Sequence, residues 1–497
     1  MIPFPDWAPD RSKFDMTVTG TATNVVPMAG LPPDPATSGE FGGYGPFPTI
    51  APVSAALAAQ PRGAIMVRDD SGDQHIFVGT TTKLYKYNTA TLVFDDKTTA
   101  ATTYAVPTGE NWSFDKFGLD VIATNKTDGP YVWTLGSSST FLALGGSPPL
   151  ARIVGVMGDF VFLGETSTQS RQLRWSGVNN DAFWTVRQRL SDYQIFPDGD
   201  PITGFVGFER GGLVFQRRAI REVIPALETD MIFQFRKTAE EHGCIAPSSI
   251  IRATDGVFYL SENGFYRYGT PPVNIGNNRV NKYFFDDINV GDTLLVQGVA
   301  DPRYTRVYWR YRSSSHASAT TTDKVLVYDY GLDRWSLINV VLSWIIQSSL
   351  GSYNLDTMDS LGNLDTLGMS LDDPALSASV PVVAALDTSY KLAFFTGGNM
   401  AATLQTGEPQ MTPQKRTFVR GFRPVADASG TSGRIAVRDS HGLTQAWKAS
   451  ASASSVTGVI PARASGLLHK FELTIPASTV WTYAHGVEPD ARGEGRQ

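Results

Sequence analysis

The sequence predicts an all-β protein: a β-propeller of six or seven blades, with a β-sandwich-like C-terminal section and an irregular N-terminal arm. Short runs of aromatic and β-branched residues, separated by turn residues, recur about every 40 residues, the length expected of one blade. The 497 residues include 47 glycines and 30 prolines, and only 18% are charged. This composition favours many short strands joined by turns over helices.

The clearest repeat units lie between residues 255 and 335. In the first, residues 255–269, two aromatic runs flank Asn263-Gly264, a strong hairpin signal because both residues tolerate positive φ. The second pairs residues 306–311 with 324–330 and closes at Trp335. Each unit therefore reads as strand, turn, strand ending in tyrosine, loop and aromatic residue.

Four earlier units of the same kind are predicted, beginning at residue 63. Their expected strands are 64–68, 74–78, 83–87 and 92–95; 112–117, 120–124, 131–134 and 141–144; 153–157, 159–163, 172–176 and 183–185; and 202–208, 213–216, 220–224 and 232–236. Blade-like units that close into a ring protect the sheet edges that would otherwise favour aggregation.

The predicted organisation has five parts. They are an extended N-terminal arm (1–60), the propeller blades (61–350), a Leu-Asp repeat loop or insertion (351–378), a final blade with the C-terminal β section (379–487) and a polar, disordered tail (488–497).

Bulk properties exclude several classes of protein. The net charge of −6 does not suit a nucleic-acid-binding protein, which would be basic. A single cysteine rules out an intrachain disulfide framework and a CxxC zinc site. We expect no signal peptide, because the N-terminus lacks basic and apolar segments, and no apolar run approaches the roughly 18 residues of a membrane span.

Signals for an enzyme or a cofactor are weak, and we expect neither. The six histidines are scattered without metal-binding spacing. His242 precedes Cys244 closely and could activate a thiol, although a buried structural cysteine is the commoner outcome.

Acidic residues leave two alternatives open. Paired carboxylates could serve a glycosidase, although adjacent loop aspartates more often form turns; the candidates are Asp198 with Asp200, Asp286 with Asp287, and Asp372 with Asp373. A second group could bind Ca²⁺ through loop oxygens or form a hydrogen-bonded loop without metal; it consists of Asp356, Asp359 and Asp365.

Two arginine clusters are the candidate assembly or channel faces. Strand alternation over residues 306–312 predicts a core face and an opposite face of Arg306, Tyr308, Arg310 and Arg312. The second cluster consists of Arg217, Arg218 and Arg221. Subunit interfaces favour arginine and aromatic residues, while a solvated face with cation–π pairs is the alternative.

The order of units from residue 200 to 339 resembles the phage stabilisation proteins that form the tail hub, or nozzle, of short-tailed bacteriophages (podoviruses). Three segments carry the resemblance. They are residues 200–205 (DPITGF) with 212–216 (GLVFQ) and 220–223 (IREV); residues 241–247 (EHGCIAP) with 255–261 (DGVFYLS); and residues 325–329 (VLVYD) ending at Trp335.

This resemblance implies a structural virion protein assembled in the host cytoplasm. Six copies would form a ring below the portal and the head-to-tail adaptor, continuing the channel for DNA ejection. The ring would carry the tail needle, spike or fibre proteins, and double-stranded DNA would pass without sequence-specific binding. A mildly acidic chain suits such a conduit, because phosphates would not adhere to it. Two alternatives remain: a carbohydrate-binding or glycan-hydrolysing propeller, and a propeller that serves as an interaction scaffold.

Overall fold

The protein is described by a computed structural model that covers residues 1–12, 18–31, 41–100, 102–226, 231–349, 381–413 and 415–493. Strands dominate these residues, so the predicted all-β class is confirmed. The helices in these ranges are α1 (Asn281–Asp287) and two 3₁₀ turns, η1 (Pro247–Ser249) and η2 (Val290–Leu295). The predicted Leu-Asp repeat and its aspartates lie outside the described residues.

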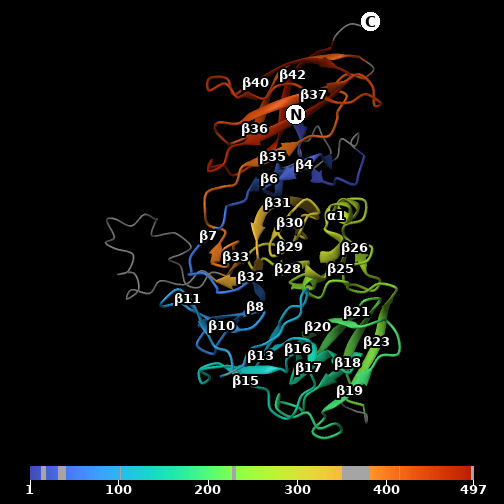
Figure 1. Ribbon diagram of the computed structural model, residues 1–497. Coiled ribbons are helices and arrows are strands. Elements are labelled where there is room, and N and C mark those ends of the chain that lie inside the picture. Colours follow the sequence, from blue (N-terminus) through green and yellow to red (C-terminus); the bar gives the residue numbers. More distant parts are fainter. Residues whose placement is uncertain are drawn as a thin grey trace.

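Seven antiparallel four-stranded units, here called sheets 1 to 7, follow one another along the described chain (Figure 1). Sheets 1 to 4 consist of β8 (Pro61–Arg68), β9 (Gln74–Thr80), β10 (Leu84–Asn88) and β11 (Val93–Asp96); β12 (Ser113–Phe117), β13 (Asp120–Thr124), β14 (Tyr131–Thr134) and β15 (Leu142–Ala143); β16 (Ala151–Met157), β17 (Phe160–Thr166), β18 (Gln169–Trp175) and β19 (Asp192–Ile195); and β20 (Ile202–Phe208), β21 (Gly211–Gln216), β22 (Ala219–Pro225) and β23 (Phe233–Glu240).

The remaining three units complete this series. Sheets 5 to 7 consist of β24 (Ile251–Ala253), β25 (Gly256–Ser261), β26 (Gly264–Arg267) and β27 (Val273–Asn274); β28 (Gln297–Ala300), β29 (Arg306–Tyr311), β30 (Thr322–Asp329) and β31 (Arg334–Leu342); and β32 (Trp344–Ser349), β33 (Pro381–Leu386), β34 (Leu392–Phe394) and β7 (Ala51–Pro52). The predicted hairpin of residues 306–330 is therefore present as β29 and β30.

Sheet 7 combines distant parts of the chain. Its first three strands come from residues 344–394, but its fourth strand, β7, precedes sheet 1 in sequence. The pairs Ala393–Pro52 and Phe394–Ala51 join β7 to β34. Strand β32 of sheet 7 also contacts β8 of sheet 1. The last sheet of the series is therefore linked both covalently and by packing to the first.

The second strand of each sheet is buried on both faces. Every residue of β17 is buried, although successive side chains point to opposite sides. Val161 and Leu163 pack with Ile122 of sheet 2, whereas Phe162 packs with Val214 of sheet 4. A sheet enclosed between two neighbours explains the nearly continuous apolar runs, which would alternate with polar residues if one face met water.

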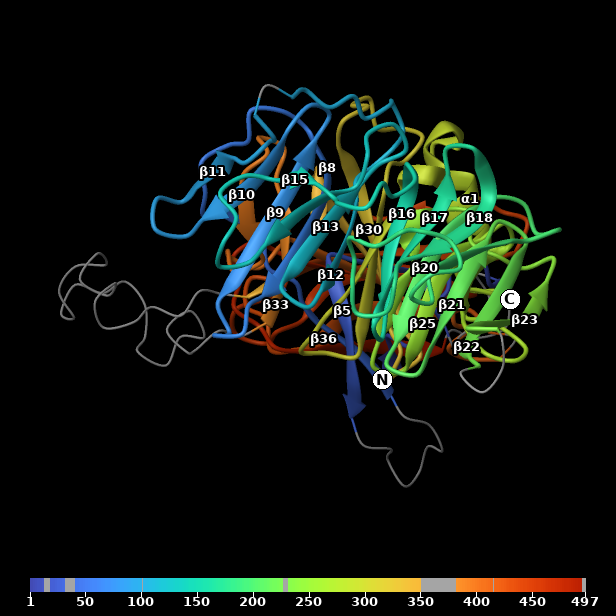
Figure 2. The same cartoon turned by 90° about the horizontal axis from the view of Figure 1, so that it is seen from below.

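The same packing repeats around the series of sheets. Seven apolar clusters of described residues link consecutive sheets: 1 with 2, 2 with 3, 3 with 4, 4 with 5, 5 with 6, 6 with 7, and 7 with 1. The cluster of sheets 5 and 6 also extends into the C-terminal strands, where it includes Phe422 and Phe471. In the cluster between sheets 7 and 1, Ile76 and Val78 of β9 pack with Ala384 and Leu386 of β33. Figure 2, which views the molecule from below, shows sheets 1 to 4 lying next to one another.

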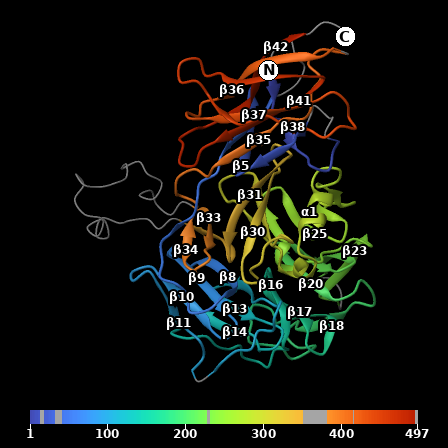
Figure 3. The ribbon, with the colours of Figure 1, turned by 45° about the horizontal axis from the view of Figure 1, so that its top comes forward.

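Two further sheets form a two-sheet unit above sheets 1 to 7 (Figure 3). One contains β40 (Ile460–Gly466), β36 (Thr417–Ala426), β42 (Ala484–Gly493), β6 (Phe41–Pro46), β5 (Val25–Leu31) and β1 (Ile2–Pro3). The other contains β4 (Thr21–Thr23), β35 (Ala402–Gln405), β41 (Leu468–Ile475), β37 (Ser432–Arg438), β38 (Ala446–Trp447) and β39 (Ala451–Ser452), and it joins sheet 6 where β4 pairs with β31. Phe422 and Phe471 meet edge to face between the two sheets, with ring centroids 5.1 Å apart.

The structure corrects three sequence predictions. The N-terminal residues are not an irregular arm: β1, β4, β5 and β6 belong to the two-sheet unit, β7 belongs to sheet 7, and β2 (Asp6–Trp7) pairs with β3 (Val18–Thr19). The tail prediction fails for residues 488–493, because β42 pairs with β36 as far as Gly493.

The third correction concerns residues 183–185, which form no strand. The strand of sheet 3 that follows β18 is β19, several residues later. Trp184 is buried in the cluster between sheets 2 and 3, and the loop around it turns at residues with positive φ, including Arg187 and Leu190. Its aromatic content thus comes from core packing within a loop.

The helices that the structure describes are all shorter or less apolar than a membrane-spanning helix needs to be.

Candidate functional site at the central cavity

A cavity of about 680 Å³ lies between the first strands of all seven sheets. Each of these strands contributes at least one lining residue: Ala64 from β8, Phe114 from β12, Val154 from β16, Phe205 from β20, Arg252 from β24, Gln297 from β28 and Trp344 from β32. The first strands belong to separate sheets, so their backbone groups on the cavity side lack a neighbouring ladder to pair with.

Polar side chains supply some of the missing hydrogen bonds. The Val154 N–H donates to Ser113 Oγ at 3.1 Å, which links sheet 3 to sheet 2. Arg252 donates to the Gly207 carbonyl at 2.8 Å, which links sheet 5 to sheet 4. Gln297 donates to the Ile345 carbonyl, and the Ile345 N–H donates back to Gln297 Oε1 at 3.2 Å, which links sheets 6 and 7.

Asp115 is the most unusual group on the cavity wall. Its Oδ2 accepts a hydrogen bond from the Val156 N–H at 2.7 Å, and its Oδ1 accepts one from the Lys116 N–H at 2.8 Å. Burial raises the pKa of this carboxyl to about 6, although the two backbone N–H groups and the Arg252 charge act in the opposite direction. Asp115 therefore joins sheet 2 to sheet 3 and keeps its proton to a higher pH than an exposed aspartate does.

Few acidic groups line the cavity among the residues that the structure describes. Asp115 and Glu209 are its acidic lining residues, and both oxygens of Asp115 already accept backbone hydrogen bonds. Across the ranges that the structure describes, no group of three or more His, Cys, Asp or Glu side chains could hold a metal ion. The polar groups of this wall primarily connect neighbouring sheets.

The structure places the first arginine cluster inside the protein. The predicted core face of β29 is buried, but so is the opposite face, because sheet 6 packs between sheets 5 and 7. Tyr308 is buried and donates to Asp301 at 3.3 Å. Arg310 is only 5% exposed, stacks 4.7 Å above the Trp344 ring and donates to Gln297 Oε1 at 2.5 Å.

The ends of this cluster are held by carboxylates. Arg306 pairs with Asp329 at 3.1 Å and also donates to the Pro27 carbonyl at 2.8 Å. Arg312 pairs with Asp292 and donates to the Ser318 carbonyl at 3.1 Å. Within one copy of the protein, these side chains stabilise sheet 6 and its neighbours.

The second arginine cluster divides between surface and interior. Arg217 and Arg218 are 56% and 53% exposed, and they approach Glu262 to 3.0 Å and 4.0 Å, respectively. Arg221 is buried, lies 4.7 Å from the Phe196 ring and pairs with Asp198. Only Arg217 and Arg218 of the predicted faces thus offer largely exposed guanidinium groups.

The acidic pairs proposed for a glycosidase have cationic or hydroxyl partners. Asp198 pairs with Arg221 and Lys237, and its pKa is lowered mainly by the hydrogen bond from Lys237. Asp286 pairs with Lys282 on α1. Asp287 accepts hydrogen bonds from Tyr311 at 2.8 Å and from Lys324 at 2.7 Å; Asp372 and Asp373 lie outside the described residues.

Cys244 lies in the apolar cluster between sheets 4 and 5. Its thiol donates to the Ala246 carbonyl at 3.1 Å, and burial raises its pKa to about 11. The ring of His242 instead lies near Tyr266, with centroids 5.4 Å apart. The structure therefore favours the interpretation of a buried structural cysteine over a thiol–imidazole pair.

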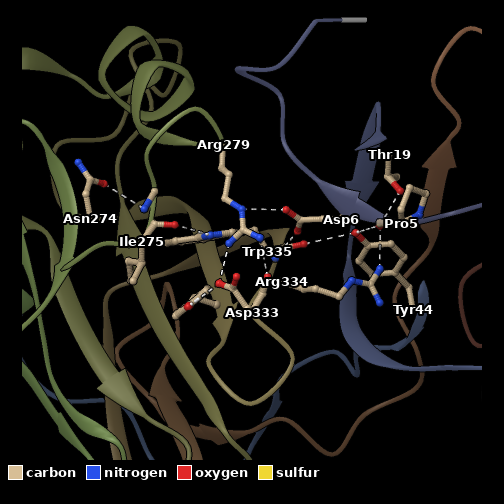
Figure 4. Close-up of polar contacts among 12 residues, drawn as sticks. Pro5, Asp6, Thr19, Tyr44, Asn274, Ile275, Arg279, Asp333, Arg334 and Trp335 are labelled. Atoms are coloured by element: carbon tan, nitrogen blue, oxygen red, sulfur yellow. Dashed lines mark hydrogen bonds and ion pairs between the residues drawn. The ribbon is translucent and has the colours of Figure 1, made fainter. Parts of the chain in front are cut away.

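A buried arginine at the start of β31 fastens the N-terminal residues to the rest of the protein (Figure 4). Arg334 donates to four backbone carbonyls: Phe4 at 3.1 Å, Pro5 at 2.7 Å, Met28 at 3.0 Å and Gly43 at 2.8 Å. Its guanidinium also lies 4.6 Å from the Tyr44 ring. We call this group the Arg334 anchor.

Asp6 adds an ionic contact beside the Arg334 anchor. Its carboxylate pairs with Arg279 at 3.2 Å and accepts the Trp335 N–H at 2.9 Å. Arg279 in turn pairs with Asp333 at 2.7 Å (Figure 4). Burial raises the Asp6 pKa more strongly than the two arginines lower it.

Sequence reasoning missed both Asp115 and Arg334. The strand predicted over residues 112–117 has polar residues at the alternate positions Ser113 and Asp115. This alternation could have predicted that one face of the strand lines a cavity. Arg334 is flanked by Asp333 and Trp335 in a loop-to-strand transition, but no local pattern indicates that its partners are more than 290 residues away.

Comparisons with known proteins identify no relatives by sequence. No family model and no curated protein match this chain. Two similar solved structures are extracellular domains of a protein named as a hybrid two-component system and, in the second structure, as a one-component system of B. thetaiotaomicron. They share 12% and 10% identity with TM-scores of 0.39 and 0.41, covering 80% and 76% of this chain. This chain spans 44% and 43% of those chains.

Proposed function

We propose that sheets 1 to 7 are the blades of a closed seven-bladed β-propeller and that the two-sheet unit is an attached β-sandwich. Seven apolar clusters between consecutive sheets support closure, because the seventh joins sheet 7 to sheet 1. The pairing of β7 with β34 supports it independently, since a strand from the start of the chain completes the last sheet. Closure leaves no sheet face of the series exposed.

On this architecture the chain acts as a structural virion protein, a tail nozzle or hub below the portal and adaptor of a short-tailed phage. The observation that carries this proposal is the correspondence between the resemblance and the sheets. The segment at 200–223 falls in sheet 4, the segment at 241–261 leads into sheet 5, and the segment at 325–335 falls in sheet 6. The three segments thus correspond to three consecutive structural units.

The size of the central cavity restricts the route that DNA could take. A duplex roughly 20 Å across, rising about 3.4 Å per base pair, fills on the order of 1,000 Å³ per base pair. A duplex running the length of seven-residue first strands such as β16 and β20, about 23 Å, would fill roughly 7,000 Å³, which is about ten times the cavity of about 680 Å³. The DNA channel would therefore lie between copies, at the centre of a homo-hexameric ring whose interfaces are heterologous and close by rotation.

Electron microscopy of the purified full-length protein tests this proposal. The protein is imaged alone and mixed with a portal–adaptor complex from the same phage genome. The expected result is a ring with a central hole at least about 20 Å wide. A protein that stays monomeric in both preparations would contradict the nozzle.

Charge reversal at the exposed arginines gives a sharper test. The double variant Arg217→Glu, Arg218→Glu should reduce ring formation if this surface contacts a neighbouring copy. Arg236→Glu in the same sheet is the matched control, because Arg236 is 63% exposed and also pairs with a carboxylate, Glu222. Equal ring yields from both variants would remove Arg217 and Arg218 from the interface.

A further inference from the structure

A second, much smaller cavity of about 30 Å³ lies where sheets 6 and 7 approach the start of sheet 1. Arginine side chains dominate its charged lining. Arg62, Arg310 and Arg312 contribute three guanidinium groups, whereas the acidic lining residue is Asp292. Thr321 and Thr322 add hydroxyl groups.

The charges around this cavity do not balance. Asp292 pairs with Arg312. Neither Arg62 nor Arg310 forms an ion pair with a carboxylate in the described ranges. Arg310 is 5% exposed, and the Nε of Arg62 is buried without a hydrogen-bond partner among those residues.

Burial of these two cations has an electrostatic cost. Desolvation lowers the pKa of Arg310 to about 9 and also lowers the pKa of Arg62. The aromatic face of Trp344 and the Gln297 amide oxygen stabilise Arg310 without neutralising it. A buried cation without a counterion is rare in proteins, because transfer from water to a low-dielectric interior is unfavourable.

We propose that this cavity binds a chloride ion between Arg62 and Arg310. The cavity is large enough for a small anion, because about 10–15 Å³ already suffices for one water-sized sphere. The bound anion would neutralise charge where sheets 6 and 7 meet the first strand of sheet 1, and would thereby strengthen that junction.

Anomalous scattering locates such an ion directly. Crystals of the full-length protein are grown with sodium bromide in place of chloride, because bromide scatters anomalously and binds similar sites. The expected result is an anomalous peak within about 3.5 Å of nitrogen atoms of both guanidinium groups, at typical hydrogen-bond distances. A cavity filled by water alone, without a peak, overturns the proposal.

Thermal unfolding tests the site in solution at constant ionic strength, with gluconate replacing chloride. Ligand that binds only the folded state stabilises it in proportion to the logarithm of its concentration. For 497 residues, a fifty-fold rise in chloride above its Kd should raise Tm by about 2 °C. Equal Tm values in chloride and gluconate would contradict the proposal.

Variants separate this site from general salt effects. Arg310→Met keeps an unbranched side chain over Trp344 but removes the charge. Arg62→Met removes the second charge at a half-buried position, where a substitution is tolerated better. Each should abolish the chloride dependence, whereas the exposed control Arg217→Met should retain it. Persistence of the full dependence in Arg62→Met would overturn the assignment even if Arg310→Met failed to fold.

Discussion

Replacement of Arg334 by methionine should release the N-terminal residues from the protein. The guanidinium donates to four backbone carbonyls that come from three separate segments, around residues 4–5, 28 and 43. Methionine keeps much of the side-chain volume but donates no hydrogen bond. Each carbonyl that loses its donor in a buried setting becomes less stable than it would be in water.

The magnitude follows from the contacts. The Pro5 carbonyl keeps two other donors, Thr19 at 2.7 Å and Tyr44 at 2.9 Å, so we assign the loss of stability to the other three contacts. Hydrogen bonds from a charged donor contribute about 1.5–3 kcal/mol each, and relief of guanidinium desolvation offsets part of the loss. We expect the N-terminal segment to lose about 4 kcal/mol of local stability.

Hydrogen exchange measured by mass spectrometry reports this local stability. The Phe4 N–H donates to the His485 carbonyl at 2.7 Å, so a peptide containing Phe4 is the reporter. A loss of about 4 kcal/mol corresponds to roughly thousand-fold faster exchange. Arg423→Met, at an exposed arginine of the two-sheet unit, should leave this peptide unchanged. An acceleration of less than tenfold in Arg334→Met would refute the reasoning.

Three further predictions concern the sheets themselves. The Asp115 pKa of about 6 lies above the ordinary 3.8, so the contribution of Asp115 to stability is greatest below pH 4 and decreases as pH rises through 6. The urea midpoint of unfolding should therefore fall between pH 4 and pH 8, and Asp115→Asn should remove this part of the pH dependence. With a pKa of about 11, the buried Cys244 thiol should react with a thiol reagent at pH 8 only after denaturation, and rapid labelling of folded protein would contradict this. Gly207→Ala should lower the free energy of unfolding by more than about 3 kcal/mol, and Tm with it, because the added Cβ would overlap the Val156 carbonyl oxygen. Gly291→Ala, whose added Cβ has its nearest contact at 3.7 Å, should leave Tm almost unchanged.

Local sequence signals predicted the strands well where a turn and an apolar run coincide. The hairpin of β29 and β30 matches its predicted bounds within two residues, and that of β25 and β26 turns at Glu262-Asn263, just before Gly264. Residues 183–185 failed because a buried loop and a short strand share the same aromatic composition. Such a distinction depends on tertiary packing.

The arrangement of the candidate site could not be predicted in the same way. Alternation along β29 suggests one polar face, and a polar face is ordinarily interpreted as a surface. Arg310 and Tyr308 are buried because sheet 7 covers that face, and nothing within residues 306–312 encodes the presence of sheet 7. Likewise, Asp115 lines the cavity only because six other sheets place their first strands opposite it.

The composition of sheet 7 has a consequence for how the chain folds during synthesis. Ile76 and Val78 of β9 lie in the core shared with β33 and β34. A ribosome that adds about 5–20 residues per second needs roughly 16 to 60 s to proceed from the end of β9 to the end of β34. Throughout that interval this apolar face of the nascent chain has no partner. We therefore expect early sheets to depend on chaperones, and folding to be slow because the decisive contacts join distant residues.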